Sequence, residues 1–457
     1  MKRPLLRLLL FLVVTLFFIV FADIFLIRTD LFTRAMMYEL QNRSDIEIAF
    51  VGSSVCRNHI NASLISEKLK KTAFNASVPD LAMQGSIALT RELYRENRPE
   101  MVVLVVDAYT FDSDLEAIEA EDMLMPWLSD MQTRLEYYRN LTGSDGWYLD
   151  RLLLFRDFGA KGLSDVFKTT SLRFFPRTAL SFFGNKAEDQ GSTVIYEGSG
   201  FLRYDTDKRA AEDIRARMQR VYTGWDYALY PRSKEMLLAY RDLVTEYGSQ
   251  LLVLISPSHT VHQLADPSYF GYTLSLMQFC HRNGIECVNF GWAKPDLMPN
   301  LDSYYYDLFH LSGDGADLFS AALATFMDCW MAGNQISSLF YGSQGEYLET
   351  IDFITNVWIE KYSVGDKWNK AREQDEREIR SLPEGTSIFL ANCNHGPHVI
   401  PEYQFVLRMK DGSEIAITDW QPDGICCPSE KKDAEFLRVY ARPAGTEADV
   451  VWYDYVF

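Results

Sequence analysis

The sequence predicts an α/β protein built on an open, doubly wound parallel sheet, with a helical insertion and a β-rich region after the sheet. Short apolar runs rich in β-branched residues alternate with stretches of helical periodicity from residue 45 to about residue 333, as expected for strands joined by crossover helices. Several runs, such as Met101–Val106, are apolar on both faces, which is typical of strands buried in a parallel sheet. After residue 334, short strands separated by Gly, Pro and Asp turns favour an antiparallel β domain.

The N-terminus carries one long apolar segment. Leu8–Ile27 spans 20 residues with Asp23 as its one charge, and a helix of this length crosses the hydrocarbon core of a bilayer. Three basic residues precede it and predict a cytoplasmic N-terminus: Lys2, Arg3 and Arg7. Residues 1–30 are therefore predicted to be the cytoplasmic tip and transmembrane anchor of a single-pass cell-membrane protein whose remainder is extracytoplasmic. A signal peptide cleaved after Val20-Phe21-Ala22 is the alternative, but the apolar run continues past that point.

Five strands and five helices are predicted in the α/β domain, which is assigned residues 31–333. The predicted strands are Ile46–Val51, Ala73–Asn75, Met101–Val106, Gln250–Ser256 and Ile285–Phe290. The predicted helices have apolar residues at helical spacing and are Ser63–Lys71, Gly85–Asn97, Ser233–Tyr247, Ser268–Asn283 and Gly313–Met331. Residues 115–200 interrupt the alternation with amphipathic stretches such as Trp147–Phe158, and we expect an inserted, mostly helical segment there.

Residues 334–457 are predicted to form a β-rich accessory domain. Its predicted strands are Ser387–Ala391, Tyr403–Arg408, Glu414–Ile417, Phe436–Ala441 and Val450–Tyr453. Strands of this length with turns between them are typical of a small antiparallel sandwich. Glycan binding, docking of a partner and covering the α/β domain are three roles that the sequence does not separate.

Charge and cysteine content narrow the function classes. The net charge is −18, and since residues 1–34 carry +3, the remainder carries −21. Such a surface repels phosphate backbones, so we expect no nucleic-acid partner. The seven cysteines lack the spacing of zinc ligands, so no metal or cofactor is predicted.

A glycine and two serines follow the first predicted strand, in Phe50-Val-Gly-Ser-Ser-Val55. A serine at a strand-to-helix turn stands at the carboxyl edge of a parallel sheet. There its hydroxyl is exposed, and neighbouring backbone N–H groups can stabilise an oxyanion. The turn therefore offers a candidate nucleophile, although Gly-Ser-Ser turns are common.

Asp307 and His310 stand three residues apart just before the last predicted helix. In a loop, this spacing lets the carboxylate hold one ring nitrogen of the histidine while the other nitrogen serves as general base. Many helix-entry loops contain such a pair, so the interpretation depends on its combination with the serine turn.

The two motifs, in this order on one α/β frame, resemble the SGNH (GDSL-like) hydrolase superfamily. The resemblance covers about residues 45–112 and 230–333 and places Gly52-Ser53-Ser54 where the family has Gly-Asp-Ser. It implies an SGNH-like fold with Ser54 as nucleophile, Ser53 being the alternative, and with Asp307 and His310 as its catalytic partners.

The oxyanion donors of that family are not matched. The family has a glycine after the second strand and an asparagine after the third. Here the second strand is followed by Asn75-Ala-Ser-Val-Pro-Asp80 and the third by Asp107-Ala-Tyr109. The backbone N–H groups of Ser54 and of the nearest glycine, Gly85, are therefore the candidate donors.

The serine turn, the unmatched donors and the N-terminal anchor are similar to the membrane-tethered branch of the superfamily. That branch includes the lipoteichoic acid D-alanylation protein DltD and the alginate O-acetylation proteins. The resemblance implies work outside the membrane on acyl groups of envelope polysaccharide, with a membrane-bound O-acyltransferase as a partner.

Arg57, His259 and Tyr306 are candidate substrate-pocket residues. Arg57 lies just past the candidate nucleophile together with His59, and these two either line the pocket or cap a helix. His259 follows the fourth strand at the carboxyl edge. Tyr306 ends the run Tyr304-Tyr-Tyr306, which forms either an aromatic wall for a sugar or ordinary packing.

The predicted function is that of an extracytoplasmic serine esterase or O-acyltransferase acting on acyl esters of cell-envelope polysaccharide. Its substrate is expected to be an acylated glycan or another acyl ester. The alternative is a non-catalytic envelope protein with an SGNH scaffold that binds glycan or a membrane O-acyltransferase, and the unmatched oxyanion donors favour it. A thioesterase or lipase acting on acyl chains is a third interpretation.

Overall fold

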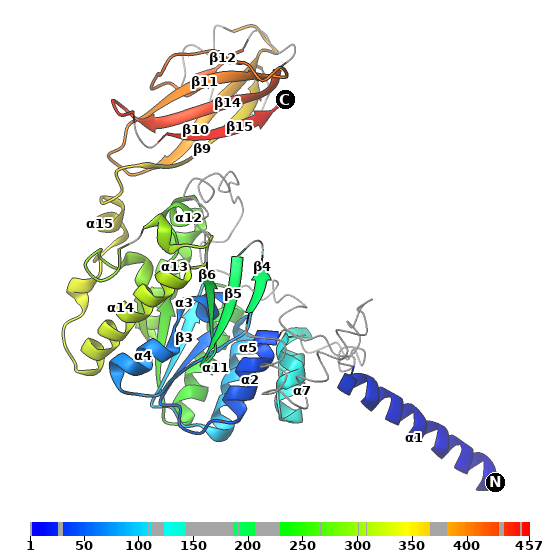
Figure 1. Cartoon of the computed structure of the whole chain (residues 1–457). Helices are drawn as coiled ribbons and strands as arrows, with labels where there is room; N and C mark the ends of the chain where they lie inside the picture. The colour runs from blue at the N-terminus through cyan, green and yellow to red at the C-terminus, as the bar shows by residue number, and fades with distance from the viewer. Residues whose placement is uncertain are drawn as a thin grey trace. The chain divides into compact units, whose positions relative to one another are not determined.

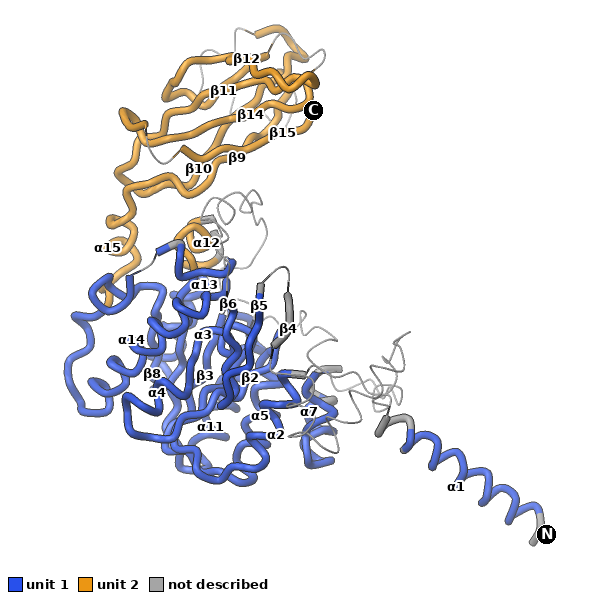
Figure 2. The backbone as a smooth tube through the Cα atoms, in the orientation of Figure 1, with its two compact units in different colours: residues 1–208, 226–258, 271–339 blue, residues 209–225, 259–270, 340–457 orange. Residues whose placement is uncertain are grey.

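The computed structural model folds as two compact units (Figure 2). The first comprises residues 1–208, 226–258 and 271–339, and the second comprises residues 209–225, 259–270 and 340–457. The residues whose structure is described are 2–25, 31–107, 110–111, 123–142, 186–189, 192–205, 229–265, 267–299, 301–307, 309–365, 382–428, 434–447 and 450–457.

A sheet covered by helices forms the centre of the first unit (Figure 1). It has five parallel strands in the order β2-β1-β3-β7-β8. The strands are β1 (Ile48–Gly52), β2 (Ala73–Ser77), β3 (Met101–Val106), β7 (Gln250–Ile255) and β8 (Glu286–Asn289). All five predicted strands, and the parallel α/β class, are confirmed. The strand order reverses between β1 and β3, and at such a switch point the loops leave the sheet in opposite directions and open a crevice at its carboxyl edge.

Helices cover the sheet because its strands are apolar on both faces. The helices are α2 (Leu31–Gln41), α3 (Ser54–His59), α4 (Ala62–Leu69), α5 (Met83–Glu96), α11 (Pro231–Glu246), α13 (Pro267–Arg282) and α14 (Gly313–Met331). Ala49, Val51 and Leu104 share one core with side chains of α2, α5, α11 and α13. Side chains of a strand alternate between its faces, so Phe50 and Val105 face the other side. The helix α14 packs against both α3 and α4.

Short 3-10 turns connect several of these elements. They are η2 (Met125–Trp127), η4 (Phe290–Trp292), η5 (Asp302–Tyr304) and η6 (Ser337–Leu339). The turn η5 comes directly before the loop that carries Asp307 and His310.

The inserted segment differs from the prediction of a mostly helical stretch over residues 115–200. Its described part contains α7 (Met131–Thr142) but also the strands β4 (Lys186–Asp189) and β5 (Ser192–Gly198). These form an antiparallel sheet with β6 (Phe201–Asp205), which begins directly after the segment. The helical prediction is wrong for β4 and β5, because the β-branched run before Gly198 and Gly200 carries strand and hairpin signals. Trp147–Phe158 lies outside the described residues.

The N-terminal segment forms α1 (Lys2–Phe25). Its apolar side chains are largely exposed, for example Phe11 at 66% and Phe17 at 63%. Within the described part of the chain, no helix meets the combined length and apolarity that crossing a membrane requires.

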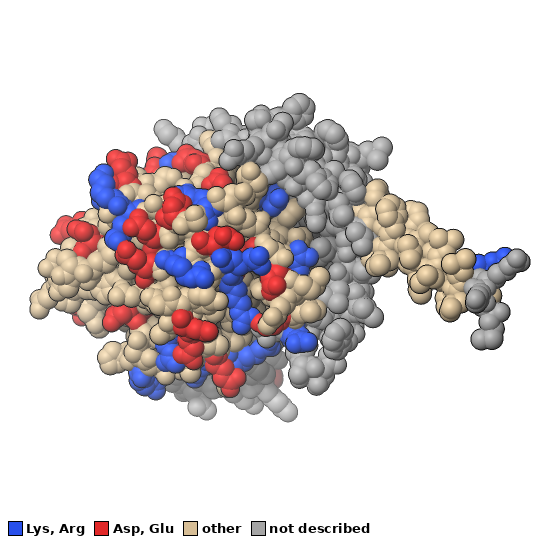
Figure 3. All heavy atoms as spheres, turned by 90° about the horizontal axis from the view of Figure 1, so that it is seen from below, with Lys and Arg blue, Asp and Glu red and all other residues tan. Residues whose placement is uncertain are grey.

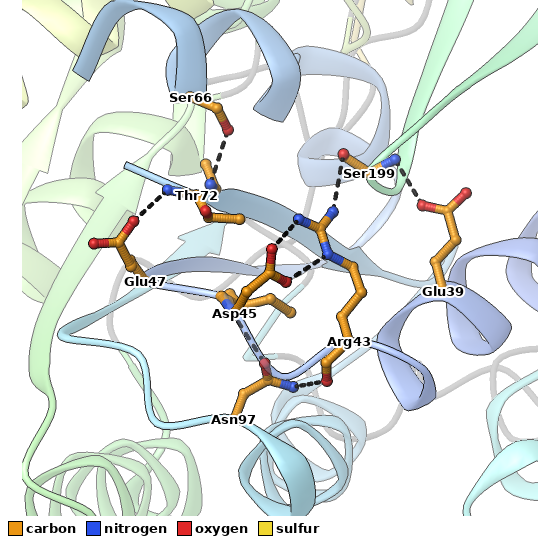
Figure 4. Close-up of polar contacts among 10 residues, drawn as sticks. Glu39, Arg43, Asp45, Glu47, Ser66, Thr72, Asn97 and Ser199 are labelled. Carbon is orange, nitrogen blue, oxygen red and sulfur yellow. Dashed lines mark hydrogen bonds and ion pairs between the residues drawn. The ribbon is translucent and has the colours of Figure 1, made fainter. Parts of the chain in front are cut away.

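Polar contacts fix the path of the chain into β1 (Figure 4). Arg43 pairs with Asp45, with Nε 3.0 Å from Oδ1 and Nη2 3.2 Å from Oδ2. The Asn97 side chain donates to the Arg43 carbonyl at 3.0 Å, and Glu47 accepts from the Thr72 amide at 2.6 Å. Glu47 and Thr72 directly precede β1 and β2, so their bond sets the start of this pair of strands. Acidic and basic side chains are interspersed on the face seen in Figure 3.

The second unit contains two antiparallel sheets, as predicted for the C-terminal region. One has the order β13-β10-β9 and the other the order β12-β11-β14-β15. The strands are β9 (Ile354–Ser363), β10 (Ser387–His395), β11 (Pro401–Met409), β12 (Glu414–Ala416), β13 (Ile425–Cys426), β14 (Ala434–Pro443) and β15 (Val451–Val456). Val357, Phe389, Phe405 and Leu437 join both sheets in one core. The short helices α12 (Thr260–Ala265) and α15 (Gln344–Leu348) also belong to this unit.

Candidate active site

The candidate nucleophile lies where β1 passes into α3, next to the switch point of the sheet. β1 ends at Gly52 and α3 begins at Ser54. A side chain at Gly52 would place its Cβ 2.5 Å from the Val105 carbonyl oxygen and 2.9 Å from Cys56 Cβ. Glycine is therefore required for the turn to pass this close to β3 and α3.

Ser54, His310 and Asp307 form one chain of hydrogen bonds. Ser54 Oγ lies 2.9 Å from His310 Nε2, and His310 Nδ1 lies 2.9 Å from Asp307 Oδ2 and 3.1 Å from Oδ1. A carboxylate only accepts, so the His310 proton is on Nδ1. The unprotonated Nε2 is then free to accept the hydroxyl proton of Ser54, which is the arrangement of a nucleophile, a general base and an orienting carboxylate.

The loop that carries Asp307 is closed by its own backbone. Asp307 Oδ1 accepts from the amides of Phe309 and His310, each at 2.7 Å, and the Tyr306 amide donates to the His310 carbonyl at 2.8 Å. Burial alone would raise the pKa of the Asp307 carboxyl. The hydrogen bonds from the His310 ring and from the two amides outweigh burial and hold this pKa below its ordinary value. Asp307 is therefore ionised at neutral pH.

Ser53, the alternative nucleophile, has a different partner. Its hydroxyl is buried and donates to Asp107 Oδ2 at 2.8 Å. Asp107 follows β3 and is held by Thr110, whose amide and hydroxyl donate to Oδ1 at 2.8 and 2.9 Å. Asp107 thus ties the end of β3 to the serine turn, and Ser54 is the serine that contacts His310.

His59 contacts the loop that carries Asp307 and His310, called the triad loop below. Its Nε2 lies 2.9 Å from the Leu311 amide nitrogen, and its Nδ1 lies 2.6 Å from Ser256 Oγ at the end of β7. From the sequence, His59 is expected either to line the pocket or to cap a helix. No local pattern signals a role for Ser256 or Asp107, because a serine or an aspartate at a strand end looks like any other turn residue.

Gly85 and Tyr306, two other predicted site residues, are both closely packed against neighbouring side chains. Gly85 is in the first turn of α5, where a Cβ would lie 2.2 Å from Leu81 Cδ1 and 3.2 Å from Tyr137 Oη. Tyr306 is buried, with its ring centroid 4.7 Å from that of Tyr204. The roles of Gly85 as an oxyanion donor and of Tyr306 in a pocket stay predictions.

Of two further candidates, Arg57 lies in α3 and His259 directly precedes α12. Arg57 is half-buried in α3, one turn beyond Ser54, and its amide donates to the Ser53 carbonyl at 3.1 Å. His259 is buried and belongs to the second unit, where its Nδ1 accepts from the Val261 amide at 3.2 Å. Contact of either residue with substrate stays a prediction. Among the described residues, no group of three or more His, Cys, Asp or Glu side chains could hold a metal ion.

Comparison with known proteins adds little to this geometry. No protein-family model matches the sequence, and no curated protein matches it. One solved structure that aligns with the chain is a protein from Streptococcus pneumonia provisionally described as a platelet activating factor. It covers 64% of this chain and 91% of its own at 10% identity, with a TM-score of 0.28. A likeness at this level carries no argument about fold or function, so the functional assignment depends on the site itself.

Proposed function

We propose that the chain is a serine esterase or O-acyltransferase of the SGNH type that acts on acyl esters of an extracytoplasmic polysaccharide. The observation that carries the proposal is the relay from Ser54 Oγ through the His310 ring to Asp307, with heavy-atom distances of 2.9 Å on both sides of the ring. A serine hydroxyl becomes a nucleophile when a neighbouring base accepts its proton. The relay lies beside the switch point of an open parallel sheet, where ligands of such sheets bind.

The reaction follows from the protonation states. Ser54 Oγ attacks the acyl carbonyl carbon while its proton passes to His310 Nε2, and Asp307 stabilises the imidazolium that forms. His310 then gives this proton to the departing alkoxide, which leaves an acyl group on Ser54. Water, or a sugar hydroxyl, attacks the acyl-enzyme with His310 as base, and the product is the free acid or a new ester.

The proposed location is the outer face of a membrane, with α1 as the attachment and a membrane-bound O-acyltransferase as a candidate partner. Support comes from the basic residues before the apolar segment and from the exposure of apolar side chains along α1, such as Leu9 at 59% and Leu16 at 61%. Contiguous apolar side chains are unfavourable in water, and lipid acyl chains would shield those of α1 from it.

Covalent labelling tests the proposed chemistry. A fluorophosphonate probe added to the full-length chain should label Ser54, and the label should be located by peptide mass spectrometry. The wild-type chain should also hydrolyse p-nitrophenyl acetate. Absence of labelling at Ser54, together with unchanged acetate turnover in Ser54→Ala, would exclude the proposed function.

A non-catalytic scaffold that binds glycan is the second candidate, and Asp107 is the observation that favours it. Asp107 follows β3, where the SGNH family has an asparagine that donates a hydrogen bond to the oxyanion. An ionised carboxylate cannot donate a hydrogen bond, and Asp107 already accepts hydrogen bonds from Ser53 and Thr110. This candidate predicts that glycan binding, measured by calorimetry with envelope polysaccharide fragments, survives in Ser54→Ala and His310→Ala while ester turnover is absent throughout.

A further inference from the structure

His59 connects three segments of the candidate active site through one ring. It is the last residue of α3, the short helix that begins with Ser54, and its side chain has no exposed surface. On one side Nδ1 lies 2.6 Å from Ser256 Oγ, and on the other Nε2 lies 2.9 Å from the Leu311 amide nitrogen. Leu311 directly follows His310, so the ring joins the helix of the nucleophile to the loop of the base.

The partners of His59 fix its protonation state. The Leu311 amide only donates, so His59 Nε2 must be the acceptor and carries no proton. The single ring proton is then on Nδ1, where the Ser256 hydroxyl oxygen accepts it. A second proton, on Nε2, would point at the Leu311 N–H and break the contact. The bond to the triad loop therefore exists only while His59 is neutral.

The surroundings of His59 favour this neutral form. Burial lowers the pKa of the ring well below its ordinary value, and the neighbouring His310 lowers it further, while the Asp307 carboxylate and the Phe309 backbone act in the opposite direction. The His59 and His310 rings meet edge to face with centroids 6.3 Å apart, and Phe319 of α14 packs at the same separation. A positive charge on His59 would oppose the imidazolium that forms on His310 when it takes the Ser54 proton.

We propose that His59 is a positioning residue that holds the Asp307–His310 loop at hydrogen-bonding distance from Ser54 by accepting the Leu311 amide while remaining uncharged. The inference rests on the proposed function, since it concerns how fast Ser54 is activated. α3 is six residues long and begins and ends with the two side chains involved. This short rigid segment sets the separation between nucleophile and base.

Rates of fluorophosphonate labelling of the full-length chain separate a positioning role from simple support of the core. His59→Phe keeps a buried ring but has no acceptor for the Leu311 amide. His59→Gln restores an acceptor, since its side-chain oxygen can accept from the Leu311 amide while its N–H₂ group donates to Ser256. We expect the maximal labelling rate of His59→Phe to fall roughly 10- to 100-fold, with the probe concentration for half-maximal rate unchanged. His59→Gln should recover most of the loss.

Thr90→Val is the matched control, because it removes another buried hydrogen bond of the first unit, between Thr90 and Tyr240 at 2.8 Å. Its labelling rate should equal that of the wild type. Equal rates for His59→Phe and wild type, or no recovery in folded His59→Gln, would overturn the inference alone. If His59→Phe does not fold, Ser256→Ala decides: a several-fold slower maximal rate supports the inference, and a wild-type rate overturns it. A wild-type chain that is not labelled overturns the proposed function and this inference with it.

Discussion

Ser54 Oγ and His310 Nε2 lie 2.9 Å apart although the two residues are 256 positions apart in the sequence. Ser54 is carried by the turn after the first strand of the sheet and His310 by the loop before its last helix. Their contact depends on β1 being an inner strand, between β2 and β3, and on α14 packing against α3. Because a variant at the site can lose activity either by losing a reacting group or by unfolding, ester turnover and folding have to be measured separately.

Ser54→Ala is expected to lose covalent labelling and ester turnover completely, whereas Ser53→Ala should still be labelled. The reason is that Ser54 faces His310, while the Ser53 hydroxyl is buried and donates to Asp107. Peptide mass spectrometry after fluorophosphonate treatment of both variants checks this. The opposite pattern, with labelling lost only in Ser53→Ala, would make Ser53 the nucleophile.

Asp307→Asn is expected to slow ester turnover roughly 10³- to 10⁴-fold while the chain stays folded. An asparagine amide can donate to His310 Nδ1, which moves the ring proton to Nε2 and leaves no acceptor for the Ser54 proton. Its amide oxygen still accepts from the Phe309 and His310 amides, so the loop remains closed. Steady-state turnover and near-ultraviolet circular dichroism measure the two effects.

Asp454→Asn is the control for that substitution. Asp454 pairs with Arg438 in the second unit, with Oδ1 2.7 Å from Nε. The same change of charge there should leave turnover of the full chain at the wild-type value. An equal loss in both variants would mean that charge alone, and not the tautomer of His310, explains the effect.

Gly52→Ala is expected to destabilise the chain by about 1–3 kcal/mol, the usual cost of overpacking. The added Cβ would lie 2.5 Å from the Val105 carbonyl oxygen, so either β3 or the serine turn must move. Urea denaturation measures the loss. Gly345→Ala is the control, because the nearest atom to its new Cβ is 3.8 Å away, and its unfolding midpoint should change little.

The free energy of unfolding is expected to depend on pH through His59. The pKa of His59 is lowered in the folded chain, so below about pH 6.5 the unfolded chain binds a proton that the folded chain does not. Stability is then lost as the pH falls, by at most about 1.4 kcal/mol for each pH unit. The loss continues until the folded pKa of His59 is reached.

The wild type minus His59→Gln difference in urea midpoint isolates this effect, since the other titrating groups are common to both chains. Above about pH 7.5, the difference between the two urea midpoints should be constant. Between about pH 6.5 and pH 5, the midpoint of the wild type should fall relative to that of His59→Gln. A difference that stays constant down to pH 5 would show that the pKa of His59 is not lowered in the folded chain.

Local pattern was enough to predict the secondary structure that depends on burial. The central strands of the sheet were predicted because a strand buried on both faces must be apolar throughout, as in Met101–Val106. The run at β9 was missed, since its alternation includes Asn356 and Lys361 and carries no turn signal before it. The strand β5 was missed because residues 115–200 are interpreted as one helical insertion, and β6 begins directly after that range.

Sequence pattern alone was enough to predict the α/β class, the antiparallel C-terminal region and the two motifs that contain Ser54 and Asp307-x-x-His310, because each depends on neighbouring residues and on the period of apolar side chains. Three contacts follow from the packing of the chain instead: Ser54 with His310, Ser53 with Asp107, and His59 with the triad loop. These contacts join residues 54 to 256 positions apart, and no local pattern encodes them. They arise only when the packing of the sheet and its helices brings the strand ends and loops to one place.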